Sequence, residues 1–187
     1  MLRKLVLLAL VGAVAVVGDL VAEQRAEAAV EAAIESRVER VGSVDAAVTS
    51  FPFLGRLAAS GRVEQLELHL RDVAEQSVTV ADLYVDARGI RLSRQVLLGE
   101  SRVRITDVDS VAARMTVTED EIRRATGVPV ELEPGMPVPD VPLPATDLLP
   151  CEPEVEVVQD AVEASCTADR LPRIVVDAVG STELRGR

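Results

Sequence analysis

The residues that could do chemistry in this chain are few, and the two cysteines are the most informative of them. Cys151 and Cys166 are the only cysteines among 187 residues. Apolar and acidic residues alternate between them with a period of two, on both sides of a turn near Gln159 and Asp160, which predicts a β-hairpin. The cysteines lie near the open ends of this hairpin. We therefore expect them to form a disulfide, with two free buried thiols as the alternative.

Catalytic chemistry has little support in the sequence. The single histidine, His69, lies on the polar face of an alternating segment, where a solvated side chain is the simpler interpretation. No Gly-x-Ser-x-Gly motif is present, and a Ser–His–Asp triad or a histidine metal site would depend on His69 alone. The 31 acidic residues are spread along the chain, so no carboxylate pair stands out. We expect a protein that is not an enzyme and that holds no metal or cofactor.

Charge and composition bear on the class of partner. The formal net charge is −11, which disfavours nucleic acid and a polybasic contact with anionic membranes. Hydrophobic residues make up 48% of the chain, but aromatic residues only 2%. The interior must therefore be aliphatic, which suits lipid acyl chains as well as an ordinary core.

The N-terminal segment resembles an export signal. Arg3 and Lys4 precede an uncharged apolar run from Leu5 to Gly18, which is short for a membrane span and typical of a signal peptide. A cut could follow Gly18 or Ala22. We expect residues 1–22 to be a signal peptide or signal anchor that exports the chain to the periplasm or cell envelope, either secreted or membrane-anchored. A buried N-terminal helix of a cytosolic protein is the alternative.

The rest of the chain predicts one α+β domain over residues 23–180, followed by a polar tail over residues 181–187. Small apolar residues at three- and four-residue spacing predict a helix over residues 20–41, capped by Gly42. Thr118 and Glu121 form a capping box that predicts a short helix over residues 118–125. Residues 133–150 contain six prolines and predict an extended connector.

Alternating segments predict an antiparallel sheet with one face in water. These segments are 66–70, 78–85, 90–92, 103–105, 115–117 and 128–132. A change of phase at Ala81–Asp82 predicts a β-bulge. Arg102 and Arg104 fall on the polar face, where contact with solvent is favoured over contact with a phosphate headgroup.

The order of these features resembles that of the LmeA-like phospholipid-binding family of actinobacteria. The resemblance covers residues 1–180 and depends on the signal, the long helix, Phe51-Pro52-Phe53-Leu54, the amphipathic strands, the motif over residues 116–122, the Pro-rich stretch and the hairpin. The family commonly has Gly before the first Phe, where this chain has Ser50.

The resemblance implies a long N-terminal helix packed on a curved, mostly antiparallel sheet, similar to half of a tubular, BPI-like lipid-binding fold. It implies an exported cell-envelope protein that binds a phospholipid, with phosphatidylinositol-type lipids among the candidates. Such a protein would carry or present the lipid in envelope lipid or glycolipid maturation. Its expected partners are phospholipid, a membrane surface or an N-terminal anchor, and an envelope protein. A structural or adaptor protein with a filled core is the alternative.

A lipid cavity in this fold would be lined by apolar side chains of the Phe-Pro-Phe-Leu segment and of the strands. The residues expected to line it are Phe51, Phe53, Leu54, Leu66, Leu68, Val80, Val103 and Ile105. For the Phe-Pro-Phe-Leu segment, a hydrophobic plug against the sheet is an equal alternative. A tunnel at the strand residues would favour lipid binding, and a solid core would favour the adaptor.

Overall fold

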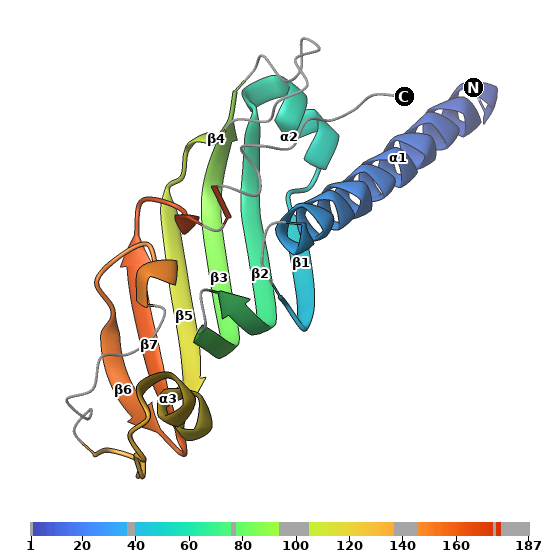
Figure 1. The fold of residues 1–187 in the computed structure, drawn as a ribbon. Coiled ribbons are helices and arrows are strands. Elements are labelled where there is room, and N and C mark those ends of the chain that lie inside the picture. Colours follow the sequence, from blue (N-terminus) through green and yellow to red (C-terminus); the bar gives the residue numbers. More distant parts are fainter. Residues whose placement is uncertain are drawn as a thin grey trace.

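The computed structural model describes residues 2–36, 40–75, 78–93, 105–136, 146–173 and 175–176. It confirms the α+β class, with an N-terminal helix and an open antiparallel sheet of seven strands (Figure 1). The strand order is β1–β2–β3–β5–β7–β6, and β4 pairs with the end of β3. The elements are α1 (Leu2–Glu35), β1 (Ser43–Thr49), α2 (Phe53–Ser60), β2 (Arg62–Glu75), β3 (Val78–Leu92), β4 (Ile105–Asp107), β5 (Ser110–Thr118), α3 (Glu119–Thr126), the 3₁₀ helix η2 (Thr146–Leu148), β6 (Glu154–Val158) and β7 (Ala161–Ala168).

The first helix starts and ends earlier than the predicted span of residues 20–41. Helix α1 runs from Leu2 to Glu35. Gly42 does not cap it, because its N–H donates to the carbonyl of Arg71 in β2 at 2.9 Å. Strand β1, which the sequence analysis did not predict, begins at the next residue. Arg40 and Gly42 form backbone hydrogen bonds with β2, and this pairing overrides the helical pattern at the end of the predicted span.

The sheet has one apolar and one polar face, as the alternation predicts. Leu66, Leu68 and Leu70 of β2 are buried, whereas Glu67 and His69 between them are only partly buried on the other face. The same alternation runs through β5, where Val111, Ala113, Met115 and Val117 are buried. The apolar face therefore carries the core.

The predicted β-bulge at Ala81–Asp82 is wrong, although the apolar phase does change there. Arg71 pairs with Asp82 and Val73 pairs with Val80, so one residue on each strand lies between the two pairs. Asp72, on β2, has a φ of 52°. The buried and exposed positions therefore exchange on both strands at the same point. The pairing register of β2 and β3 continues without the extra residue that defines a β-bulge.

Helices and connecting segments pack on the apolar face. Ile34 of α1 and Ile122 of α3 belong to the core cluster. Helix α3 forms as predicted, since Thr118 and Glu121 make the capping box and Gly127 ends the helix with a φ of 73°. The connecting segments add core residues, which are Leu132, Leu148, Leu149, Leu171 and Val175.

The strand predicted over residues 128–132 does not form. Pro129 has no N–H to donate to a sheet ladder. The N–H of Leu132 instead donates to the carboxylate of Glu119 at 2.6 Å, while its side chain packs into the core. The apolar alternation of this segment therefore reflects burial against the sheet and not membership of it.

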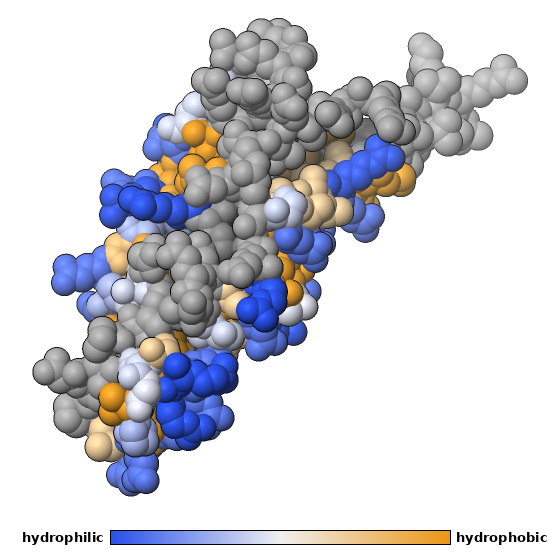
Figure 2. All heavy atoms as spheres, viewed as in Figure 1, coloured by the Kyte–Doolittle hydropathy of each residue, from blue (hydrophilic) through white to orange (hydrophobic). Residues whose placement is uncertain are grey.

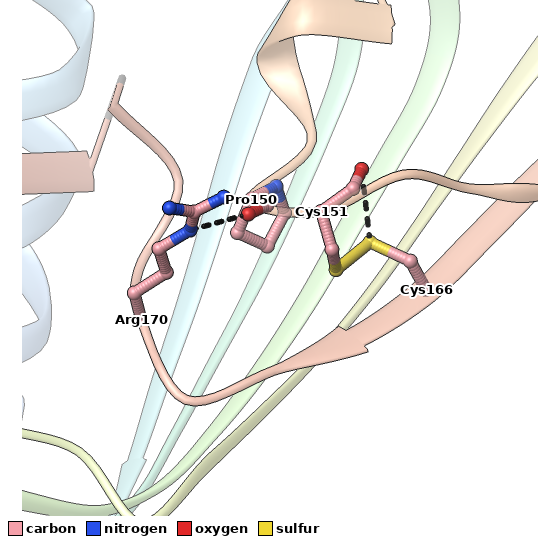
Figure 3. The surroundings of a disulfide bond; sticks show 4 residues. All are labelled: Pro150, Cys151, Cys166 and Arg170. Carbon is pink, nitrogen blue, oxygen red and sulfur yellow. Dashed lines mark hydrogen bonds between the residues drawn. A yellow bond between two sulfur atoms is a disulfide. The ribbon is translucent and has the colours of Figure 1, made fainter.

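The C-terminal hairpin and its disulfide are confirmed. β6 and β7 pair in register around a turn at Gln159–Asp160. Cys151 and Cys166 are bonded, with Cα atoms 6.0 Å apart, as a disulfide requires (Figure 3). The bridge ties the segment before β6 to the middle of β7.

Helix α1 also covers the free edge of the sheet. The carboxylate of Glu31 accepts the N–H of Ala46 at 3.0 Å, and that of Glu27 accepts the N–H of Val48 at 2.9 Å. These N–H groups belong to edge strand β1 and point away from β2. The two glutamates therefore satisfy backbone donors that would otherwise offer an edge to another strand.

Candidate functional site

An apolar hollow of about 370 Å³ lies between β4 and the segment that follows β7. Its walls include Ile105, Val108, Leu171 and Val176. Val108 and Leu171 are buried, whereas nearly half of the Val176 surface is exposed, so the hollow opens to solvent. Figure 2 shows hydrophobic surface beside β4, bordered by hydrophilic residues. This volume is at the lower end for ligand sites and suits part of a lipid rather than a whole diacyl molecule.

Arg170 gives this apolar hollow a cation at its rim. Its Nε donates to the carbonyl of Pro150 at 2.6 Å, next to the disulfide (Figure 3). Its Nη atoms form no hydrogen bond or ion pair within the part of the chain that the structure describes. A guanidinium held on one side and free on the other is suited to a phosphate group.

Two carboxylates share the rim with Arg170. Asp107 is paired with Arg91 at 2.6 Å, which neutralises it. Asp169 lies beside Arg170 in the wall and offsets part of its charge. The rim is therefore close to neutral, and apolar contact must supply most of the affinity for a ligand here.

The structure separates the residues that the sequence analysis expected to line one cavity. Ile105 lines the hollow. Leu66, Leu68 and Val80 are buried in the packed core of the sheet. Val103 lies outside the described residues, as do Arg102 and Arg104. Sequence reasoning missed Val108, Arg170, Leu171 and Val176, which border the hollow.

The Phe-Pro-Phe-Leu segment forms the start of α2, at the same end of the sheet as β4 (Figure 1). Phe53 is buried in the core, whereas Phe51 and Leu54 are exposed. Phe53 therefore packs against the core, which is the contact that the plug interpretation expects of this residue. The other two side chains face outward and line no described hollow.

Asp19 of α1 fixes this segment in place. Its Oδ2 accepts the N–H of Phe53 and its Oδ1 accepts the N–H of Leu54, both at 2.7 Å. Pro52, at the N-cap of α2, makes no side-chain cap of its own. The carboxylate that interrupts the apolar run in the sequence is thus the cap of a helix 34 residues later.

Ser50, where the family commonly has glycine, lies directly before this segment. It is buried, and its hydroxyl has no hydrogen-bond partner among the described residues. Its backbone φ is not positive, so nothing in the local conformation requires glycine. The serine adds a buried hydroxyl without a compensating bond.

A second hollow, of about 530 Å³, lies on the polar face of the sheet. Its polar walls come from Tyr84, Asp86, Arg114, Glu152, Glu154, Ser165 and Thr167. Arg114 is paired with Glu163 at 3.0 Å and Asp86 with Arg88 at 2.9 Å, so Glu152 and Glu154 set the sign of the charge. An acidic, mostly polar surface disfavours a phosphate headgroup, and its apolar lining is limited to Ala112, Ala113 and Cys166.

The polar face also carries the two residues nearest to acid–base chemistry. Burial, and then the charges of Glu67 and Asp86, raise the pKa of Tyr84 above its ordinary value, so the phenol stays protonated at neutral pH. His69 lies on this face, as predicted, with Nε2 against the carboxylate of Asp82 and its ring edge-on to Tyr84. Within the described residues, no group of three or more metal-binding side chains converges.

The structure is an α+β fold with an open antiparallel sheet and an apolar hollow whose rim carries Arg170, Asp107 and Asp169. The sequence comparison assigns the family. The model of the LmeA-like phospholipid-binding family matches residues 17–185, and the chain belongs to this family. Neither a curated protein nor a solved structure matches the chain.

The family match begins close to Asp19. Residue 17 precedes the carboxylate by two positions, so the matched region includes the contact between α1 and α2. Within the described part of the chain, no helix combines the length and apolarity needed to cross a membrane.

Proposed function

We propose that this protein is exported to the cell envelope and binds a phospholipid there, with part of the acyl chains in the apolar hollow. It carries or presents the lipid for envelope lipid or glycolipid maturation, and it acts by binding rather than by catalysis. Its partners are a phospholipid and the membrane surface from which the lipid comes. The observation that carries the proposal is the apolar hollow with Arg170 at its rim in a member of a phospholipid-binding family.

The charges around the hollow support a mainly apolar mode of binding. Each methylene removed from water contributes about 0.8 kcal/mol, whereas one exposed guanidinium near Asp169 contributes little after screening. Raising salt from low to physiological concentration is therefore expected to change phospholipid affinity little. A collapse of affinity by orders of magnitude would instead indicate surface electrostatics.

Native mass spectrometry of the protein purified from cells tests the proposal directly. We expect a phospholipid to co-purify with the folded chain or to bind on incubation with liposomes. Val176→Glu places a charge in the hollow at a partly exposed position, and Val158→Glu is its matched control on β6. Bound phospholipid is expected to fall about tenfold or more in Val176→Glu, and to be unchanged in Val158→Glu.

The role of Arg170 is tested separately. Arg170→Gln removes the guanidinium, and Arg173→Gln is a control for an exposed arginine close by in the sequence. Because Arg170 is exposed and Asp169 offsets part of its charge, its loss is expected to weaken binding only about two- to threefold. Equal binding by both variants would remove Arg170 from the site without removing the apolar hollow.

Export rests on the N-terminal pattern and on the disulfide, since disulfides form and persist in oxidising compartments. A fusion of residues 1–40 to a reporter that is active only outside the cytoplasm is expected to give signal. A stably made but silent fusion would count against export.

A structural or adaptor role is the second candidate, because the apolar face of the sheet is densely packed. Leu68, Leu70, Leu83 and Val85, at its centre, have no exposed surface. If no phospholipid co-purifies and none binds from liposomes, the adaptor is favoured and the lipid-binding function is wrong.

A further inference from the structure

Exposed apolar side chains gather where α1 meets the start of α2. Each of them has between 42% and 62% of its surface exposed, although each is a large hydrophobic residue. They account for six of the ten exposed large hydrophobic side chains in the described residues. We call them the junction surface, which consists of Val16, Val17, Leu20, Val21, Phe51 and Leu54.

The junction surface is held together by Asp19. The two hydrogen bonds that the Asp19 carboxylate accepts bring the backbone of Phe53 and Leu54 against α1. Val16 and Leu20 lie within one helical turn of Asp19, a rise of about 5 Å. The exposed apolar side chains of α1 and those at the start of α2, more than 30 residues apart in the sequence, therefore lie at the same level along α1.

We propose that the junction surface docks this protein on a phospholipid bilayer. Val16, Val17, Leu20 and Val21 expose one apolar face of α1, and in the sequence this face continues the uncharged run that begins at Leu5. Beyond this level Gln24 and Arg25 are exposed, so the helix changes from apolar to polar within one turn. A helix whose exposed face changes from apolar to polar within one turn matches the boundary between lipid and water.

The position of the junction surface relative to the hollow favours a bilayer over a protein partner. The N–H of Leu92 donates to the carbonyl of Gly61, at the end of α2, at 2.7 Å. Leu92 also pairs with Ile105, which lines the hollow. The hollow and α2 therefore lie at the same end of the sheet, as Figure 1 shows for α2 and β4. Docking through the junction surface brings that end to the membrane.

The inference deepens the proposed function, because a protein that takes up a phospholipid must reach a bilayer. It is tested on the full chain with one added cysteine, at Leu54→Cys or Phe51→Cys, labelled with an environment-sensitive fluorophore. Val158→Cys on β6 is the matched control, since Val158 is similarly exposed but lies at the far hairpin. Labelling is done without reductant, so that the bridged cysteines stay paired and the added thiol is the single reactive one.

The labelled proteins are mixed with phosphatidylcholine vesicles that carry a nitroxide on the acyl chain close to the headgroup. We expect a blue shift and strong loss of fluorescence for labels at 51 and 54, and neither change at 158. Equal responses at 51, 54 and 158 in protein that floats with vesicles would overturn the inference, as would a failure to float. A blue shift at 51 and 54 that needs no vesicles, together with a dimer on gel filtration, would assign the surface to a second copy instead.

The outcome is separable from that of the proposed function. Native mass spectrometry reports bound phospholipid whether or not the chain docks. Protein that docks at 51 and 54 but carries no phospholipid would contradict the lipid-binding function alone. Protein that carries phospholipid while its labels at 51 and 54 stay in water would contradict the docking surface alone.

Discussion

Replacing Asp19 by alanine removes the carboxylate that joins α1 to α2. The carboxylate accepts two backbone N–H groups at 2.7 Å, and only 5% of the residue is exposed. A hydrogen bond to a charged group contributes about 1.5–3 kcal/mol, and an N-cap contributes about 1 kcal/mol. Because both bonds share one carboxylate, we expect Asp19→Ala to lower the free energy of unfolding by about 2–3 kcal/mol. Asp19→Asn keeps one acceptor oxygen, and we expect about half of that loss.

Urea unfolding followed by far-UV circular dichroism measures this loss, since the chain has no Trp and a single Tyr for fluorescence. With a slope of about 1–3 kcal/mol per molar urea, the midpoint is expected to fall by about 0.7–3 M. Gln24→Ala is the control, because Gln24 is exposed on the same helix, and it should change stability by less than about 0.5 kcal/mol. If Asp19→Ala is as stable as Gln24→Ala, the carboxylate does not stabilise the junction of the two helices.

Three further predictions concern stability and processing. Replacing Cys151 and Cys166 together by serine is expected to cost about 3 kcal/mol in urea unfolding, as a closed loop of this size implies, and an unchanged midpoint would contradict it. Ser50→Ala removes a buried hydroxyl without a partner and should raise stability by about 1 kcal/mol, measured in the same way; a loss would mean that the hydroxyl is bonded in solution. If the chain is processed on export, N-terminal sequencing of the mature protein should find its first residue no later than Asp19. A cut after Gly18 meets this condition, although it removes Val16 and Val17 from the junction surface. A mature protein that begins beyond Asp19 would show that the contact with α2 is dispensable.

Local patterns in the sequence determined the elements whose signals lie within a few residues. Thr118 and Glu121 predict the start of α3 from a three-residue spacing, and both hydrogen bonds of the box form. The alternation that precedes and follows Gln159 predicts the β6–β7 hairpin. The same period of two divides the residues of β2 and β5 between a buried and a polar face. These features depend on neighbours in the chain, so one sequence suffices to predict them.

Elements with long-range partners were missed or misplaced. Strand β1 has alternating Val44, Ala46 and Val48, but its backbone is satisfied by β2 on one side and by glutamates of α1 on the other. The residues of β1 alone do not predict that β2 and the glutamates of α1 are its partners. The strand expected over residues 128–132 failed for the opposite reason, because its alternation marks burial while Pro129 prevents pairing.

The candidate site shows the same division. An aliphatic interior and the membership of a phospholipid-binding family follow from the sequence, and Ile105 was among the residues expected to contact lipid. The hollow itself joins Ile105 and Val108 to Arg170 and Leu171, which are more than 60 positions away. Asp19, which directly follows the apolar run that ends at Gly18, caps a helix that begins at Phe53. Composition and periodicity determine which residues are apolar and which of them share a face of a helix or strand. The tertiary structure decides which of these residues meet. That choice depends on contacts between distant segments, which no local sequence pattern encodes.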